Sequence, residues 1–190
     1  MYTYIHMKVF YTAAFSGKEK YQKHYDSVLT AIEATGVDVI SPEKGNYKDI
    51  LTKSEQNRLA KERQVHYEAI RKGILWADAV VIENSQESFQ LGMEAAFAML
   101  SKKPVLCVSI FEDFSEKIVN PYFSASKYNE YNIDEIVSEF VQKHNKGHLS
   151  ERFNLFLSPR QVDYLEKVAK NEGLNKSEYL RDLIEKDQQK

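Results

Sequence analysis

The sequence predicts an α/β protein with a doubly wound parallel sheet, flavodoxin-like or Rossmann-like, followed by a small C-terminal segment of a different kind. Short apolar runs alternate with amphipathic stretches of helical spacing, which is the pattern of βαβ units. The run DAVVIEN (78–84) is almost uniformly apolar, as is typical of strands buried on both faces. After residue 144 this alternation stops. We therefore expect a first domain over 1–144, a linker over 145–151 and a second domain over 152–190.

Composition limits the class of protein. The chain has 190 residues, 43% hydrophobic and 28% charged, as in ordinary globular proteins. Its net charge of -2 gives no overall basic field for nucleic acid. No apolar run approaches about 18 residues and no signal peptide is evident, so no membrane partner is expected. The single cysteine, Cys107, excludes an internal disulfide and fits a reducing compartment, so a cytoplasmic location is predicted.

The first half of the first domain begins with a strand over 7–12 and a small-residue loop, AAFSGKE. A helix from about Glu19 to Thr35 follows, and Gly36 ends it. A second strand over 37–40 leads into a polar loop. The charge-rich stretch from Ser54 to about Trp76 is expected to form one long helix.

The second half adds the strand 78–84, the turn SQESFQLG, a helix, the strand 104–110 and a helix from about Ile133 to Lys143. Doubly wound sheets bind ligands beyond the carboxyl ends of their strands. The loops AAFSG and SQESFQLG and the loop after Ile40 all fall there. We expect the functional site at this edge of the sheet.

Glu94 is the one charged residue in QLGMEAAFAML (90–100), a helix that should be covered on most sides. Charged side chains are seldom buried without a partner or a function. A glutamate in a first helical turn can also simply complement the helix dipole. Both interpretations stay open on this stretch alone.

Two pieces of the chain, KVFYTAAFSG and ADAVVIENSQESFQLGMEAAFAMLSKKPVLCV, resemble the nucleoside 2-deoxyribosyltransferase family and its nucleotide N-glycosidase relatives. The resemblance covers residue 7 to about 143 and implies that Glu94 is a nucleophile that attacks C1′ of the sugar while the base departs. Positive charge develops on C1′ in such a reaction, which a carboxylate stabilises or traps covalently. The resemblance thus implies an enzyme that cleaves an N-glycosidic bond, by hydrolysis or base transfer. No cofactor is expected, and since His24, His66, His144 and His148 lack metal-ligand spacing, no metal is expected either.

The resemblance also implies the substrate contacts. A serine at the position of Ser88 accompanies 5′-phosphorylated substrates in the family, because a carboxylate there would repel the phosphate. Ser16, Gly17 and Lys18 can complete a phosphate nest, although such residues are also ordinary in turns. Phe15 falls where the family places an aromatic contact to the base, or else it is a lid over the core. The expected substrate-binding residues are Phe10, Tyr11, Phe15, Ser16, Gly17, Lys18, Ser88, Gly92 and Asn129, with Asn129 or Ser124 completing a neighbouring subunit's site.

The sequence departs from the family pattern at two positions. The tyrosine that hydrogen-bonds the nucleophile aligns with Phe10, and the adjacent Tyr11 should point to the opposite face of the sheet. The aspartate that would donate a proton to the base aligns with Ile70. Glu68 is the nearest acid and the candidate replacement, although two residues along a helix is a rotation of about 200°. Asp78, at a strand start, is interpreted as structural.

Residues 152–186, RFNLFLSPRQVDYLEKVAKNEGLNKSEYLRDLIEK, resemble the ribbon-helix-helix fold. Phe153, Leu155 and Leu157 alternate with Arg152, Asn154 and Phe156, so that the predicted strand has one apolar face. A strand and two short helices cannot bury a core alone. A second copy of the chain is the simplest partner, and a homodimer or homotetramer is expected.

The C-terminal segment also supports an alternative function, a DNA-binding transcriptional regulator that senses a nucleotide. Arg152, Asn154 and Phe156 occupy the strand face that would enter the major groove. Residues 145–190 carry nine Lys and Arg against eight Asp and Glu, which is poor for phosphate-dominated affinity. A third alternative is that the segment only dimerises the chain. The sequence favours an enzyme with a dimerising tail, with DNA as a further partner of that tail.

Overall fold

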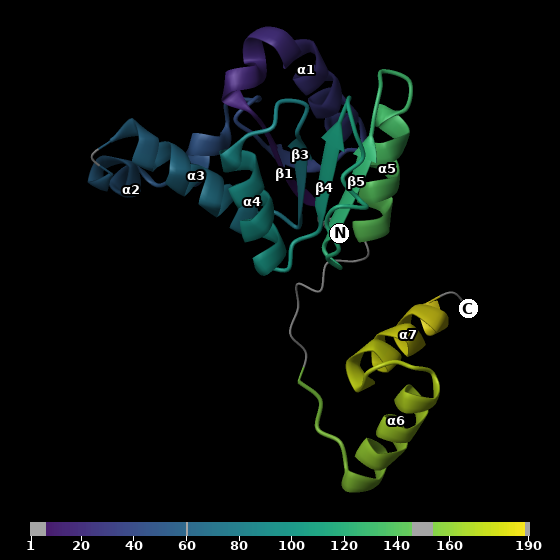
Figure 1. Cartoon of the computed structure of the whole chain (residues 1–190). Coiled ribbons are helices and arrows are strands. Elements are labelled where there is room, and N and C mark those ends of the chain that lie inside the picture. Colours follow the sequence, from purple (N-terminus) through teal and green to yellow (C-terminus); the bar gives the residue numbers. More distant parts are fainter. Residues whose placement is uncertain (1–6, 60, 146–153, 189–190) are drawn as a thin grey trace. The chain divides into compact units, whose positions relative to one another are not determined.

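The structure, a computed structural model, describes residues 7–59, 61–145 and 154–188 (Figure 1). The chain divides into two compact units, Met1–His148 and Leu149–Lys190. No helix in these ranges is long and apolar enough to cross a bilayer.

The first unit is built on a sheet of five parallel strands, and it confirms the predicted doubly wound, flavodoxin-like α/β fold. The strand order is β2-β1-β3-β4-β5, and every neighbouring pair is parallel. The strands are β1 (Lys8–Ala13), β2 (Asp38–Ile40), β3 (Ala79–Glu83), β4 (Val105–Ser109) and β5 (Phe123–Lys127). β5 was not among the predicted strands. This edge strand is short and half-buried. Its sequence, FSASK, consists mostly of small and polar residues, so it lacks the apolar run that marks the other strands.

Helices cover both faces of the sheet. Alternate residues of β1 point to opposite faces, so that Tyr11 packs in one core and Phe10 in the other. The core that contains Tyr11 joins the sheet to α1 (Lys18–Ala34) and α5 (Ile133–His144). The core that contains Phe10 joins it to α3 (Glu62–Trp76) and α4 (Phe89–Leu100). These two layers place the carboxyl ends of β1 and β3 beside the start of α4.

The single helix expected over 54–76 is wrong, because the chain forms two helices there, α2 (Lys53–Arg58) and α3. Leu59 and Lys61 have extended backbone between them. Glu55 of α2 forms an ion pair with Lys72 of α3 at 2.5 Å, and the Gln56 amide donates to carbonyls of the preceding segment, which includes the short helix η2 (Tyr47–Ile50). These contacts fold α2 back along the chain. They join residues far apart in sequence, so no local glycine or proline signals the break.

The interpretation of Asp78 as structural agrees with the structure. Its carboxylate accepts a hydrogen bond from the backbone N–H of Lys8 at 2.9 Å, and its own N–H donates to the carbonyl of Lys8 at 2.8 Å. Asp78 thus fixes the start of β3 against the start of β1.

The second unit contains α6 (Pro159–Asn171) and α7 (Lys176–Gln188). Ser158 and Gln161 form the hydrogen bonds of the predicted N-cap, and Gly173 has the positive φ that ends α6. Residues 154–157 are irregular in the single chain rather than a strand, while Arg152 and Phe153 lie outside the described residues. A two-stranded ribbon takes its hydrogen bonds from a second strand, so the ribbon remains a prediction for an assembly of two chains.

Candidate active site

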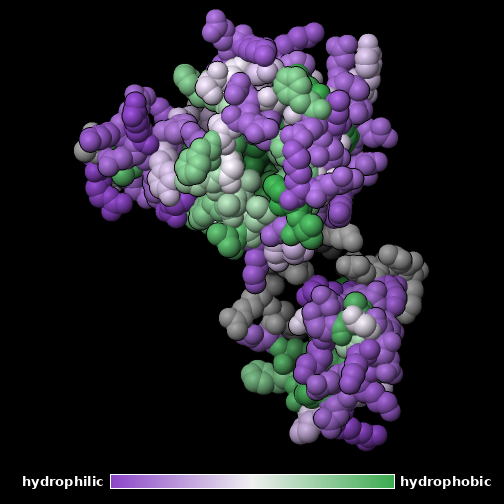
Figure 2. All heavy atoms as spheres, viewed as in Figure 1, coloured by the Kyte–Doolittle hydropathy of each residue, from purple (hydrophilic) through white to green (hydrophobic). Residues whose placement is uncertain are grey.

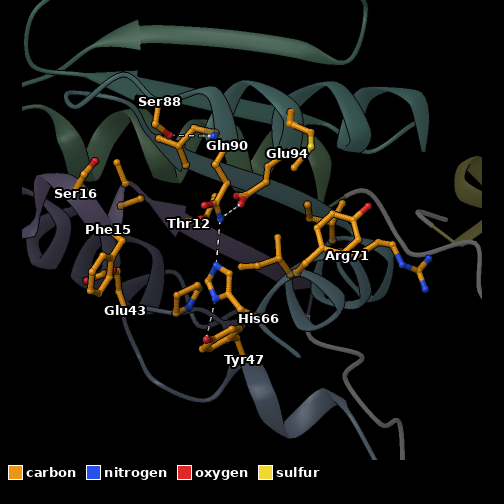
Figure 3. A pocket seen from close by; sticks show the side chains of 18 of the residues that line it. Thr12, Phe15, Ser16, Glu43, Tyr47, His66, Arg71, Ser88, Gln90 and Glu94 are labelled. Atoms are coloured by element: carbon orange, nitrogen blue, oxygen red, sulfur yellow. Dashed lines mark hydrogen bonds between the residues drawn. The ribbon is translucent and has the colours of Figure 1, made fainter. Parts of the chain in front are cut away.

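A cavity of about 980 Å³ lies at the carboxyl ends of the strands, where the fold class predicts a ligand site. Its walls come from the end of β1 and the loop after it, the loop after β2, one face of α3 and the first two turns of α4 (Figure 3). Basic, acidic and aromatic side chains line it together with apolar ones.

Glu94 points into this cavity from α4 and is only 3% exposed. Its Oε1 accepts a hydrogen bond from Nε2 of Gln90 at 2.8 Å. Its Oε2 is buried and has no hydrogen-bond partner among the described residues. A buried carboxylate oxygen that accepts no hydrogen bond retains its lone pairs for an electrophile placed in the cavity.

The electrostatic environment of Glu94 differs from the expectation. Glu94 is the sixth residue of α4 rather than a first-turn residue. The helix dipole acts mainly within the first turn, so it contributes little to ionising this group. Burial raises the pKa of Glu94 above its ordinary value, while the hydrogen bond from Gln90 and the neighbouring Thr12 hydroxyl act in the opposite direction.

Thr12 is a cavity residue that the sequence analysis missed. Phe10, at the position of the family's tyrosine, is fully buried and does not line the cavity; its ring packs so closely on Gly73 of α3 that a Cβ there would overlap it. Thr12 is two residues further along β1, so it lies on the same face and meets the cavity beside Glu94. Tyr11 faces the other core as predicted, where its hydroxyl donates to the carbonyl of Tyr25 at 3.0 Å. Phe10 and Tyr11 are therefore removed from the substrate-contacting set.

The loop after β1 contributes three of its four expected residues to the cavity, Phe15, Ser16 and Lys18. Phe15 is 83% exposed, so its ring is available to a ligand rather than buried as a lid. Gly17 does not line the cavity. Its N–H donates to the Ala14 carbonyl at 3.0 Å, and a Cβ at Gly17 would overlap the Tyr25 hydroxyl, so its role is to let the loop close.

Glu43, in the loop after β2, is a second buried carboxylate that the sequence analysis missed. Its side chain is 2% exposed and lines the cavity. Lys18 binds one of its oxygens at 3.0 Å and the Gln22 amide donates to the other at 3.0 Å. The charge of Lys18 is therefore balanced by Glu43, which reduces the positive field that Lys18 was expected to offer a phosphate.

Ser88 lines the cavity as the N-cap of α4. Its Oγ accepts a hydrogen bond from the N–H of Leu91 at 3.2 Å. The hydroxyl hydrogen remains to donate to a ligand, and the first backbone N–H groups of a helix have no acceptor within the helix. An anion near Ser88 would find donors there.

Three other expected residues lie outside the cavity lining. Gly92 is on the outer face of α4 with open space around it. Asn129 is exposed and its side chain accepts from the N–H of Tyr131. Glu68 accepts two hydrogen bonds from Arg71, at 2.9 and 2.6 Å, which lower the pKa of its carboxyl group. Glu68 is thus an ion-pair partner of Arg71 that lies outside the cavity lining.

The position of the family's aspartate, Ile70, does line the cavity. One helical turn earlier on the same face of α3 lies His66, which the sequence analysis considered only as a metal ligand. Nδ1 of His66 is 2.9 Å from the Tyr47 hydroxyl, and Nε2 is 3.1 Å from Nε2 of Gln90. Tyr47, His66, Gln90 and Glu94 therefore form one chain of hydrogen bonds along the cavity wall (Figure 3).

No group of three or more His, Cys, Asp or Glu side chains in the described ranges is placed to hold a metal ion. Cys107 is buried in β4, and burial raises the pKa of its thiol to about 12, so it is a packed structural thiol.

No protein-family model and no curated protein matches the chain. Among solved structures, the CMP N-glycosidase BcmB of Clostridium botulinum is 15% identical, with 73% of this chain and 98% of that chain covered and a TM-score of 0.44. A 2-deoxyribosyltransferase from Bacillus psychrosaccharolyticus is 19% identical, with 67% and 90% covered and a TM-score of 0.46. A flavodoxin from the Archaea is 15% identical, with 73% and 99% covered and a TM-score of 0.36. Similarity at this level does not distinguish among the activities of these proteins.

Proposed function

We propose that this protein cleaves the N-glycosidic bond of (deoxy)nucleoside 5′-monophosphates, with Glu94 as the nucleophile. The observation that carries the proposal is the state of the Glu94 carboxylate. One oxygen is held by Gln90, and the other is buried at the cavity without a hydrogen-bond partner among the described residues. The sequence pieces around Glu94 and Ser88 support the same assignment through their resemblance to the transferase and N-glycosidase family.

The reaction would proceed in two steps. Oε2 of Glu94 forms a bond to C1′ as the C1′–N bond breaks, and the departing base keeps the bonding electron pair and takes a proton from solvent water. In the second step the oxygen of water, or a nitrogen of another base, attacks C1′. The bond between C1′ and Oε2 breaks, its electron pair returns to Glu94, and the proton of the attacking group passes to solvent. Water gives hydrolysis and a base gives transfer. Burial strengthens the interaction of the carboxylate with the positive charge that develops on C1′.

Three features of the cavity support a nucleoside 5′-monophosphate as the substrate. Ser88 and the start of α4 offer hydrogen-bond donors, and Ser16 lines the same cavity from the loop after β1. Phe15, exposed on that loop, offers a ring on which a base can stack. Glu43 adds an acceptor for a hydroxyl or amino group of the nucleotide once its contact with Lys18 is shared.

The test is to incubate the purified protein with a panel of ribo- and deoxyribonucleoside monophosphates and to measure free base by chromatography. Base release is expected from the wild-type protein, with a loss of at least about a hundredfold in Glu94→Gln, which removes the nucleophile but keeps the shape of the side chain. Glu87→Gln is the matched control, because Glu87 is exposed beside α4 and lies outside the cavity lining. Equal rates for Glu94→Gln and the wild-type protein would refute the proposal.

A further inference from the structure

When Glu94 is ionised, the hydrogen bonds that link Tyr47, His66, Gln90 and Glu94 determine which nitrogen of the His66 ring carries a proton. Nε2 of Gln90 is close to both Oε1 of Glu94 and Nε2 of His66. An amide nitrogen is only a donor, so with Glu94 ionised both of its neighbours must be acceptors. Nε2 of His66 therefore carries no proton, and the proton of the neutral ring is on Nδ1, where it is donated to the Tyr47 hydroxyl oxygen.

Protonation of His66 breaks this arrangement. An imidazolium has N–H groups at both ring nitrogens, so Nε2 would face the Gln90 amide donor to donor. Turning the amide over would present its oxygen to His66, but that oxygen would then face the ionised Oε1 of Glu94. The turned amide is compatible only with a protonated Glu94, which cannot attack carbon.

We propose that Tyr47, His66 and Gln90 are positioning residues that hold the Glu94 carboxylate for attack, and that the neutral form of His66 is the one that does so. This inference rests on the proposed role of Glu94. His66 acts through Gln90, whose Nε2 is 3.1 Å from Nε2 of His66 and 2.8 Å from Oε1 of Glu94.

The groups around His66 favour its neutral form. Burial lowers the pKa of His66 below its ordinary value, and the positive charge of Lys48 lowers it further, while Glu62 acts in the opposite direction. Lys48 and Glu62 pair with each other at 3.4 Å, which limits the net field of either one. Arg63 lines the same cavity and adds positive charge, Tyr47 faces Nδ1, and Gln90 with Glu94 behind it faces Nε2.

The direction of the pH dependence follows from these contacts. A neutral His66 is required, so kcat/KM is expected to rise as pH rises through the pKa of His66 and to be lost below it. That pKa lies below the ordinary value of about 6.5. Because kcat/KM reports groups of the free enzyme and the free substrate, ionisation of Glu94 and of the substrate phosphate also contributes to the acid limb. The contribution of His66 is the part that is lost in His66→Gln and that follows the His66 titration measured by NMR in the unliganded protein.

Substitutions at His66 separate positioning from other roles. His66→Gln places an acceptor oxygen near the position of the His66 Nε2 and does not titrate, so it should lose less kcat/KM at pH 7.5 than His66→Lys, and its acid limb should move to lower pH. His66→Lys places a permanent cationic donor there and should lose at least about tenfold at every pH. His144→Gln, the same change at the end of α5 and outside the cavity lining, is the matched control and should behave as the wild-type protein.

The NMR chemical shifts of the two ring nitrogens of His66 report its tautomer and do not depend on activity. We expect the Nδ1–H tautomer in the wild-type protein and a shift toward the Nε2–H tautomer in Tyr47→Phe, which removes the acceptor at Nδ1. A predominant Nε2–H tautomer in the wild-type protein would overturn the inference. So would an unchanged acid limb in His66→Gln, or a kcat/KM that falls as pH rises through the His66 titration, since that sign marks a proton donor. If the wild-type protein released no base, the proposed function would fall while the spectra still decided the tautomer.

Discussion

A nucleophilic carboxylate must be ionised and yet free of water, and these two demands oppose each other. Glu94 is 3% exposed, and burial raises its pKa, so by itself it would tend toward the protonated acid. The hydrogen bond from Gln90 and the nearby Thr12 hydroxyl offset part of this effect without covering Oε2. The site thus stabilises the ionised form at one oxygen, while the other accepts no hydrogen bond from the described residues.

At the scale of residues, the sequence predicts the parts of the site that come shortly after strands. Glu94, Ser88 and Phe15 all belong to loops or helix starts that follow strands, so the fold class alone brings them to one edge of the sheet. Thr12, Glu43 and His66 were missed because their roles come from contacts with distant segments. His66 reaches Gln90 across 24 positions, and nothing in the local sequence announces that contact.

The close contact between Phe10 and Gly73 leads to a prediction about stability. A Cβ at Gly73 would overlap the buried Phe10 ring, so Gly73→Ala should lower the free energy of unfolding by about 1–3 kcal/mol in chemical denaturation. Gly92 is also a glycine within a helix but has open space around it, so Gly92→Ala should be neutral or stabilising by up to about 1 kcal/mol. Equal effects of the two substitutions would show that the Phe10 contact is not tight.

Ser88 gives a prediction about substrate choice. Asp is as good an N-cap as Ser, so Ser88→Asp should keep α4 intact. Its carboxylate would face the phosphate. Two negative unit charges that are 4 Å apart repel by about 4 kcal/mol at an effective dielectric constant near 20. We expect KM to rise by at least about tenfold for monophosphates and to be unchanged or lower for nucleosides. An equal change for both classes, with Ser88→Asn as the uncharged control, would place Ser88 away from the phosphate.

At the scale of elements, α4 differs from its sequence-based expectation. The helix was expected to be covered on most sides, but the single chain leaves an outer face open. This outer face consists of Phe89, Gly92, Met93, Ala96 and Leu100, which follow one another at helical spacing. Figure 2 shows apolar side chains gathered on the surface where α4 lies. The apolar pattern of the sequence is therefore satisfied only in part within one chain.

We predict that a second copy of the chain covers the outer face of α4. Leu100 is 84% exposed and lies outside the cavity lining, so Leu100→Glu should place an unpaired charge in the contact without touching the site. Self-association measured by analytical ultracentrifugation should weaken by at least about tenfold, or about 1.4 kcal/mol. Gln64→Glu, which adds the same charge at an exposed position of α3, should leave the association constant unchanged. An identical association constant in Leu100→Glu would exclude this face.

At the scale of the whole molecule, the first unit has a large apolar core of its own, whereas the described part of the second unit buries few apolar residues. The first unit buries two apolar clusters, one on each face of the sheet. In the described part of the second unit only Leu165 and Ala169 are buried apolar residues, whereas Leu155, Phe156, Tyr164, Leu183 and Ile184 are exposed. The sequence predicted both helices here from their caps and periodicity. It could not show the ribbon in a single chain, since its hydrogen bonds would come from another molecule.

The second unit is expected to hold two chains together. A protein ending at residue 148 keeps the whole of the cavity lining, so it should retain the nucleotide chemistry of the full chain within about threefold. Because the exposed apolar residues of the second unit need a partner, the full chain should form a larger or tighter assembly than the truncated one. Light scattering over a range of concentrations gives the comparison, and Leu155→Glu, an exposed residue on the predicted apolar face of the ribbon, is the point variant in the full chain that should have the same effect as truncation. An assembly that is unchanged by both would exclude dimerisation as the role of the tail. Binding of fragmented genomic DNA by the full chain, lost on truncation, would then assign the exposed apolar and polar residues of the tail to a nucleic-acid partner instead.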